Sequence, residues 1–513
     1  MRIQNSFKNM AFGLSGQIII SLMGFIVRTI FIKELGMDYL GLNSLFTSIL
    51  VMLSVANLGF DSAIVYSLYK PLADKDYIKI QALMNLYKKA YRMVGSAILI
   101  NGLCLMPFLP LIVGKDTNIQ NINTFYLLFL INSVLSYFLI YKKSIIIADQ
   151  KNYIISKIHT AATVTLNLFQ LLQLVVVGDY LFYLTIQIVF NSLENLYVAY
   201  KANKLYPFLK EKNNNKLSAG DRKSFFQNLY ALMLYKISGV IISGTDNIII
   251  SIFIGVHFVG VYSNYLLILG TVSMMLGFIF SSLTASVGNL IVSEDTDKKY
   301  LIFRVINFSN FWFFGMCSIC LWALINPFIS LWIGDQYLLN KLVVLAIIIN
   351  FYTAGMQYAS SIYRETTGLF KKGKYRPLFA AVINIAVSVF LASYIGIAGV
   401  IYGTVISRLC IYFWYDPYVI FKYVFNRKVK SYFGRYLIYA SLVTICAGIM
   451  DYLVKSLYTG NVFLFFLFCL IGLVISNLVF YTVFRKSEEF VYLRGVFSML
   501  IGKRRAHLTS KVS

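Results

Sequence analysis

Long apolar runs separated by short polar stretches extend from near the start of the chain to about residue 485. A helix needs about 20 mainly apolar residues to cross a bilayer. About fourteen runs qualify, with centres near residues 21, 53, 103, 131, 168, 190, 241, 272, 315, 352, 387, 408, 446 and 473. The first run is long and has no small-x-small cleavage site, so we expect it to remain as the first helix. The pattern predicts an all-α polytopic membrane protein with about 14 transmembrane helices.

Basic residues are distributed unevenly between the two sides of these runs. If the N-terminus is cytoplasmic, only four of the 46 Lys and Arg residues fall in external loops: Lys33, Lys115, Lys341 and Lys455. Cytoplasmic loops of membrane proteins carry such an excess of Lys and Arg. The pattern therefore predicts cytoplasmic N- and C-termini. The net charge of +25 then indicates contact with anionic membrane lipids rather than with nucleic acid.

The composition agrees with this interpretation. The chain is 59% hydrophobic and 13% charged, with a mean hydropathy of +0.72, whereas a soluble domain is about 25% charged. The predicted external loops are too short to build the acceptor site of a membrane glycosyltransferase or polysaccharide polymerase. No G-x-x-x-x-G-K-[ST] loop is present, so the chain does not carry its own ATPase motif. We expect a protein that is not an enzyme.

Cysteine and histidine give no evidence of a metal or redox site. All six cysteines fall in apolar runs, and the C-x-x-C pair Cys317 and Cys320 lacks the electropositive setting of a reactive thiol. His159, His257 and His507 are scattered along the chain. We therefore expect no cofactor other than a coupling ion.

A short repeat divides the chain. The segment LGMDYLGLNS (35–44) matches IGVHFVGVYS (254–263) at its glycines and its final serine. We call these segments tag 1 and tag 2. Each follows the first helix of a half, which predicts two parallel lobes related by a pseudo-two-fold axis along the membrane normal, as in transporters that work by alternating access.

This repeat sets the predicted domains, which are an N-terminal six-helix lobe (1–200), a basic cytoplasmic linker (201–223), a C-terminal six-helix lobe (224–420), and helices 13 and 14 with a basic cytoplasmic tail (421–513). Ser218 and Asp221 form an S-x-x-D pattern that predicts the start of the seventh span. The segment 76–92 has apolar residues at helical spacing, and we expect an interfacial amphipathic helix there.

Seven ionisable residues lie within the apolar runs: Arg28, Lys236, Arg408, Asp61, Glu194, Asp246 and Asp416. A charge at the bilayer centre costs about 2.5–3.5 kcal/mol on insertion scales, so each should face protein or water. The three residues Asp61, Glu194 and Asp416 are predicted near cytoplasmic helix ends, where water could hydrate them. Asp61 and Glu194 are also candidates for lining a cavity. Arg28 could either extend toward the outer surface or face such a cavity.

The seventh span has a polar stripe about 100° wide. Its members are Asn228, Lys236, Gly239, Ser243, Asp246 and Asn247. The stripe could fix packing through an ion pair to another helix, or it could line a central cavity. Lys236 and Asp246 are ten residues apart, about 15 Å along a helix, so they cannot satisfy each other, which favours the cavity. Its excess of positive charge would suit a phosphate or diphosphate, with Asp246 as a candidate for coupling to Na⁺ or protons.

Four segments resemble a known family: GMDYLGLNSLFTSILVMLSVANLGFDSAIVYSLYKPLADKD (36–76), YKISGVIISGTDNIIISIFIGVHFVGVYSNY (235–265), LWIGDQYLL (331–339) and YRETTGLFKKGKYRPL (363–378). They are similar to the bacterial polysaccharide flippases, the Wzx-type branch of the multidrug/oligosaccharidyl-lipid/polysaccharide exporter superfamily that also contains the MATE exporters. The resemblance extends from about residue 5 to residue 485.

The resemblance implies a MATE-like fold and a substrate. The expected activity is transfer of an undecaprenyl-diphosphate-linked oligosaccharide from the cytoplasmic to the outer leaflet of the bacterial plasma membrane, for capsule or other surface polysaccharide. By position, Arg28, Lys236 and Arg408 would bind the diphosphate and Asp246 would couple an ion. The polymerase and glycosyltransferases of the same pathway would be partners. The alternative is a MATE-like cation-coupled exporter of small molecules, which the cationic cavity disfavours.

Overall fold

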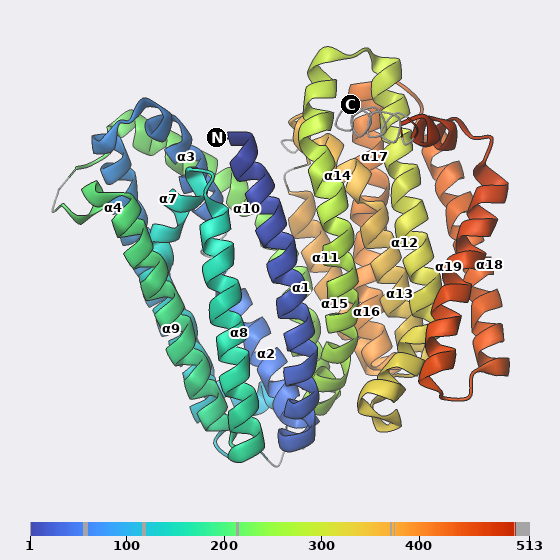
Figure 1. The fold of residues 1–513 in the computed structure, drawn as a ribbon, viewed down its shortest axis with the longest axis horizontal. Coiled ribbons are helices and arrows are strands. Elements are labelled where there is room, and N and C mark those ends of the chain that lie inside the picture. Colours follow the sequence, from blue (N-terminus) through green and yellow to red (C-terminus); the bar gives the residue numbers. More distant parts are fainter. Residues whose placement is uncertain are drawn as a thin grey trace, which may run out of the picture. The chain divides into compact units, whose positions relative to one another are not determined.

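The structure is a computed structural model that describes residues 2–54, 60–114, 119–211, 215–369, 372–373, 375–496 and 498. Every regular element in these residues is a helix (Figure 1). Contacts group the chain into two compact units, Met1–Ser263 and Asn264–Ser513, which we call unit 1 and unit 2. The lobe boundaries predicted from the repeat stay a prediction, since contact grouping does not test a repeat.

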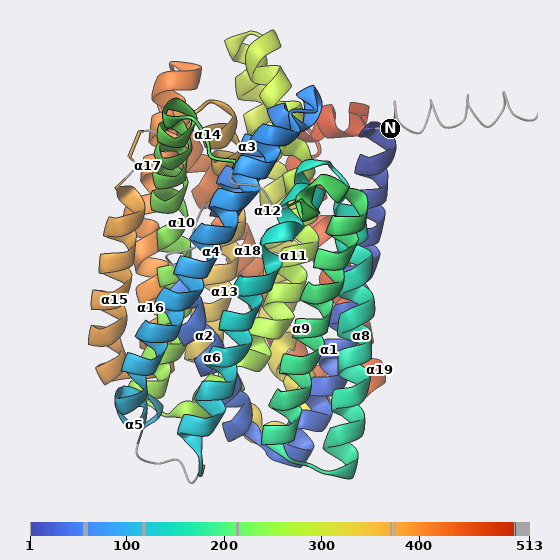
Figure 2. The ribbon, with the colours of Figure 1, turned by 90° about the vertical axis from the view of Figure 1, so that its left-hand side faces the viewer.

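The helices of unit 1 are α1 (Arg2–Leu35), α2 (Met37–Leu53), α3 (Phe60–Asp74), α4 (Tyr77–Leu105), η2 (Met106–Phe108), α5 (Leu109–Val113), α6 (Ile122–Leu139), η3 (Ile140–Lys142), α7 (Lys143–Ala148), α8 (Asn152–Val176), α9 (Tyr180–Leu205), η4 (Pro207–Lys210), α10 (Ala219–Phe253) and the start of α11 (Val256–Ser293). Within the unit, α1 packs on α8, α6 packs on α4 and α9, and α10 packs on α2 and α3. Figure 2 shows α4, α6 and α9 toward the viewer.

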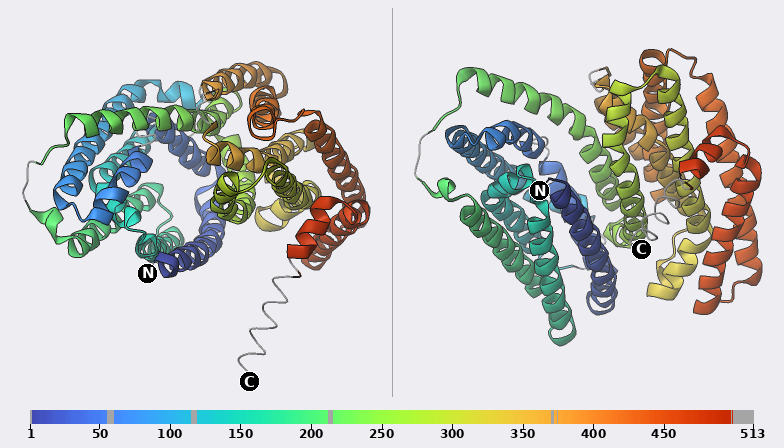
Figure 3. Two further views of the ribbon diagram at one scale, coloured as in Figure 1. Left: turned by 90° about the horizontal axis from the view of Figure 1, so that it is seen from above. Right: turned by 45° about the horizontal axis from the view of Figure 1, so that its top comes forward.

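The helices of unit 2 are the rest of α11, α12 (Thr296–Ile333), η5 (Asp335–Tyr337), α13 (Lys341–Met356), α14 (Tyr358–Thr366), α15 (Arg376–Ile395), α16 (Ile397–Arg408), η7 (Leu409–Phe413), α17 (Trp414–Ile420), η8 (Phe421–Phe425), α18 (Lys430–Leu457) and α19 (Val462–Phe484). The segments η7 and η8 are π-helical. Helix α12 contacts α13, α18 and α19, while α15 packs along α16. In the left panel of Figure 3 most helices are seen close to end-on, whereas the first part of α10 lies across the view.

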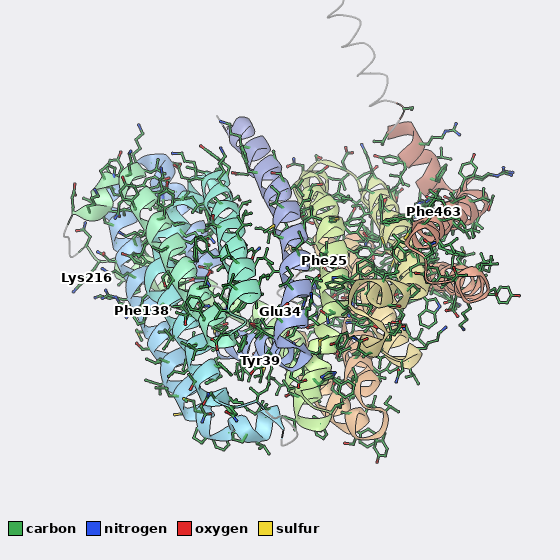
Figure 4. The ribbon with its side chains drawn as sticks, turned by 60° about the horizontal axis from the view of Figure 1, so that its bottom comes forward. Phe25, Glu34, Tyr39, Phe138, Lys216 and Phe463 are labelled. Carbon is green, nitrogen blue, oxygen red and sulfur yellow. The ribbon has the colours of Figure 1, made fainter. Side chains whose placement is uncertain are left out.

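Nine helices in the described part of the chain are long and apolar enough to span a membrane. They are Tyr77–Val113, Asn152–Val176, Val256–Ile291, Thr296–Ile333, Lys341–Thr366, Arg376–Ile395, Ile397–Phe425, Lys430–Leu457 and Val462–Phe484, and shorter apolar helices occupy Met37–Leu53, Ile122–Phe138 and Gly239–Phe253. Each of the predicted run centres lies in a different helix. Large apolar side chains also face outward, such as Phe463 on α19, which is 73% exposed (Figure 4). The prediction of an all-α multi-pass membrane protein is confirmed.

Local sequence signals explain where several helices begin. Ser218 is the N-cap of α10 and accepts a hydrogen bond from the Asp221 backbone N–H at 3.1 Å, which confirms the start predicted there. Asp179 caps α9 in the same way, through the N–H of Phe182 at 2.7 Å. Gly36 precedes α2 with a φ of 91°, a conformation that glycine adopts without the steric cost of a Cβ.

The two tags lie against each other within unit 1. A Cβ added to Gly41 would stand 2.0 Å from the carbonyl oxygen of Val256, and one added to Gly260 would stand 2.4 Å from the carbonyl oxygen of Met37. Small residues at a helix crossing permit this close backbone approach. The first turns of α2 and α11 therefore cross at two glycines that the repeat relates.

The segment 76–92 is not a separate interfacial helix, so that prediction is wrong. It forms the first turns of the long helix α4. Its apolar face is buried inside unit 1, where it packs with residues of α3 and α7, and its members are Ile80, Leu83, Met84, Tyr87 and Tyr91. Helical periodicity shows that a face is apolar, but it does not distinguish a lipid surface from a protein core.

The core of unit 2 is rich in aromatic rings. Phe311 of α12 stacks on Tyr439 of α18 at 4.2 Å between ring centroids and meets Phe480 of α19 at 4.5 Å. Offset-stacked and tilted ring pairs add about 0.5–1.5 kcal/mol beyond their buried area. These contacts attach the last two helices to α12.

Candidate functional site

Arg28 bonds to the protein rather than extending toward an aqueous surface. Its Nη1 donates to the carbonyl oxygen of Ser263 (3.2 Å) and its Nη2 donates to Ser263 Oγ (2.6 Å), where tag 2 ends. Its Nε is buried and has no hydrogen-bond partner in the described part of the chain. Tyr183 of α9 interacts with it electrostatically. The guanidinium is thus enclosed by protein groups of unit 1.

The turn that follows Arg28 carries further polar contacts. His257 Nδ1 and Asp38 Oδ1 lie 2.6 Å apart and join the two tags. Tyr39 packs against Tyr180, with 4.9 Å between the ring centroids, and Figure 4 labels Glu34 and Tyr39 at this turn. The two tags are therefore joined by an acid–histidine pair as well as by their glycines.

Asp246 and Asn247 lie in the C-terminal half of α10 and are both buried, each with 8% of its surface exposed. Asn247 Nδ2 donates to Ser48 Oγ of α2 at 2.9 Å, while Asn247 Oδ1 has no hydrogen-bond partner among the described residues. Asp246 interacts electrostatically with Tyr262 of α11. The polar stripe of this helix therefore meets α2 and α11 at Asp246 and Asn247.

Three other members of the predicted stripe cannot be placed. The side chains of Asn228, Lys236 and Ser243 lie outside the described residues, although the backbone of all three is helical in α10. Their role stays a prediction from the sequence.

Asp61 stands at the first turn of α3 and lines a cavity of about 390 Å³ within unit 1. Tyr87 and Tyr91 of α4 both donate hydrogen bonds to its Oδ1. Glu194 of α9 has a different partner, since its Oε1 lies 3.0 Å from His159 Nδ1 of α8. The two carboxylates therefore sit in separate places in unit 1.

Arg408 ends α16 in unit 2. Its Nη1 donates to Gln357 Oε1 at 3.0 Å, and Tyr436 of α18 is close enough to interact with it electrostatically. Residues 409–413 continue the helix as a π-turn, so the side chain stands where the regular helix changes. π-Turns are frequent at functional sites.

Asp416 is buried and ion-paired, so the prediction that water hydrates it is wrong. Only 3% of its surface is exposed, and its Oδ1 pairs with Arg364 of α14 and Arg376 of α15. Arg364 also donates to the carbonyl oxygens of Leu369 (3.2 Å) and Lys372 (2.9 Å). Neither arginine is predicted as a site residue from the sequence, since both lie outside the long apolar runs.

Solved structures of membrane transporters match the fold of this chain. A lipid II flippase, MurJ in an inward closed conformation, matches with a TM-score of 0.64 and 15% identity over 93% of this chain and 98% of that chain. The chain has the fold of this transporter class. An inward-facing MATE family multidrug transporter of the MOP superfamily matches with a TM-score of 0.59 and 12% identity, over 76% and 91% of the two chains. A mutant of the Vibrio cholerae MATE transporter VcmN matches with a TM-score of 0.56 and 12% identity, over 83% and 99%.

Comparison by sequence adds nothing to this result. No protein-family model matches the chain, and no curated protein matches it. At these identities the structural likeness shows the fold, which together with the apolar helices makes this a multi-pass membrane protein of the MATE and MurJ fold. The substrate has to be argued from the chain itself.

Proposed function

We propose that this protein is an alternating-access flippase for an undecaprenyl-diphosphate-linked oligosaccharide. It moves the lipid from the cytoplasmic to the outer leaflet of a bacterial plasma membrane for assembly of a surface polysaccharide. The observation that carries the proposal is the likeness to a lipid II flippase over 93% of the chain. The MATE transporters cover 76–83%, so the flippase accounts for more of the chain.

Two part-buried cations indicate the chemistry of the substrate. Arg28 of α1 and Arg408 of α16 bond to protein groups within apolar runs of the chain, where a charge is costly and marks a functional site. A guanidinium binds diphosphate oxygens through paired N–H donors, and Lys236 adds a point charge. An exporter of organic cations would favour carboxylates in these places, so the arginines support the flippase over the MATE-like alternative.

Coupling falls to Asp246 in this proposal. It is a buried carboxylate, and the Oδ1 of the next residue, Asn247, has no hydrogen-bond partner in the described residues. A carboxylate in a membrane helix can carry a proton or bind Na⁺. Anionic lipids would contact the basic loops, and the polymerase and glycosyltransferases of the pathway would act before and after transfer.

The test is an accessibility assay on cells depleted of the protein. The lipid-linked oligosaccharide should become inaccessible to a sugar-modifying enzyme added outside, and wild-type protein should restore access. Arg408→Ala and Arg28→Ala should reduce the restored access roughly tenfold, as expected for the loss of a charge-assisted hydrogen bond. Arg427→Ala is the matched control, because Arg427 is exposed and pairs with the exposed Asp297.

Two results would contradict the proposal. Depletion that leaves the oligosaccharide accessible, in cells without a second flippase, means that the protein moves another substrate, and export of an organic cation would then be measured. Arginine variants that restore full access would remove the diphosphate role from these two residues.

A further inference from the structure

The described residues that line the cavity beside Asp61 all belong to unit 1. Its wall combines residues of α2, α3, α4, α6 and α9, which pack on one another in that unit. The volume of about 390 Å³ is in the range of small-molecule sites and far exceeds what a single ion needs. The space can therefore hold a molecule of several heavy atoms.

The wall of this cavity contains both polar and aromatic side chains. The polar groups include the Asp61 carboxylate, the Asn132 and Gln187 amides, and hydroxyls of Thr47, Ser133 and Ser136. The amides and hydroxyls both donate and accept hydrogen bonds, as the hydroxyls of a sugar do, and the carboxylate accepts them. The half-buried ring of Tyr137 offers an apolar surface for the C–H faces of the same molecule, and the rings of Tyr91 and Phe129 are buried in the wall. An acyl chain has no hydrogen-bonding groups and would leave these polar groups unpaired.

Asp61 is fixed in place and still accessible. Both tyrosine hydroxyls donate to Oδ1, and Asp61 itself lines the cavity. Tyr87 is almost fully buried and its ring lies 4.4 Å from that of Tyr91, so it acts as a positioning residue for the carboxylate. Asp61 itself is exposed.

We propose that this cavity is a sugar subsite, in which Asp61, Asn132 and Gln187 bind hydroxyl groups of the substrate's oligosaccharide. The inference rests on the proposed function and adds to it a site, separate from the arginines, that recognises the headgroup. The subsite selects for sugar, whereas the arginines act on the diphosphate that all such lipids share.

The test compares two probes on purified full-length protein in nanodiscs. The probes are the undecaprenyl-diphosphate-linked oligosaccharide extracted from depleted cells and undecaprenyl diphosphate without sugar. Wild-type protein should bind the sugar-bearing lipid more tightly. Asp61→Asn keeps the shape and an acceptor for the tyrosines but removes the charge, and it should weaken binding of the sugar-bearing lipid roughly tenfold with little change for the sugar-free lipid.

Controls make the result specific. Gln187→Leu removes a second polar group of the wall and leaves Tyr87 and Tyr91 unchanged. It should weaken binding of the sugar-bearing lipid, and it tests the subsite if Asp61→Asn folds poorly. Asp149→Asn is the matched control, because Asp149 bonds to Tyr206 in the same unit outside the cavity, and both affinities should stay at wild-type values.

The outcomes separate the two proposals. If Asp61→Asn and Gln187→Leu both prefer the sugar-bearing lipid as strongly as wild type does, the subsite proposal is wrong. The flippase proposal is then unaffected. Equal losses for both probes also overturn the subsite, since the cavity would then act on the shared diphosphate or on folding. If wild-type protein binds neither lipid, both proposals fail.

Discussion

Replacing Gly41 by alanine would put a methyl group into the crossing of α2 and α11. The new Cβ would lie 2.0 Å from the Val256 carbonyl oxygen, and real Cβ atoms keep at least 3.0 Å, so the helix starts must separate by about 1 Å. The obstacle is backbone, which no rotamer change can relieve. Overpacking costs about 1–3 kcal/mol, and we expect the upper end of that range.

The control is Gly24→Ala in α1, where nothing lies within 4 Å of an added Cβ. Alanine in a helix is favoured over glycine by about 0.5–1 kcal/mol, so Gly24→Ala should be neutral or stabilising. Helix propensity alone predicts the same gain at Gly41, and the packing predicts a loss. The sign of the effect therefore decides between them.

The assay is thermal unfolding of detergent-purified protein, followed by the fluorescence of a thiol-independent dye. Gly41→Ala should lower the melting temperature by roughly 5–10 °C relative to Gly24→Ala, on the scaling for domains of this size. A melting temperature at or above that of wild type would refute the close approach of the two tags.

Two further predictions concern charge. Asp416→Ala should destabilise unit 2 by about 3–5 kcal/mol, because it leaves two arginines buried without their carboxylate, whereas Asp297→Ala removes an exposed pair and should cost at most about 1 kcal/mol. Similar losses for the two variants in urea unfolding would contradict the buried pairing. The hydrogen bond from Lys79 lowers the pKa of Asp221 below its usual range, so the stability it contributes is present above the unfolded pKa of about 4 and is lost as the pH falls through the lowered folded pKa. Between pH 7 and pH 3 the melting temperature of wild type should fall slightly more than that of Asp221→Asn. An equal fall in the two proteins would contradict the contribution of the Lys79–Asp221 pair.

Much of the fold follows from patterns that the sequence carries locally. A run of about 20 apolar residues needs no knowledge of its neighbours to indicate a spanning helix, and Ser218 caps α10 through a contact three residues away. The repeat was visible because both tags keep their glycines. That the two tags pack on each other was not visible, since it depends on how helices 219 residues apart in sequence meet within unit 1.

The candidate site was harder to predict for the same reason. The sequence predicts that water hydrates Asp416, because a carboxylate near a helix end can reach the aqueous phase. Only the fold shows that Arg364, 52 residues earlier, pairs with it. The sequence shows that Asp61 is a charge within an apolar run. It does not show that Tyr87 and Tyr91, which lie on another helix, donate hydrogen bonds to it. Sequence reasoning locates charges in a membrane helix, and tertiary structure supplies their partners.

The π-turn at residues 409–413 holds one residue more than a regular helical turn between Arg408 and Asp416. Because the extra residue is taken up within that turn, the helix on either side keeps its facing. Deleting one residue there should restore regular winding and leave Asp416 on the side of Arg364 and Arg376. The same deletion in a regular stretch of the helix would turn every later residue by about 100°. The π-turn therefore makes this stretch tolerant of a one-residue deletion.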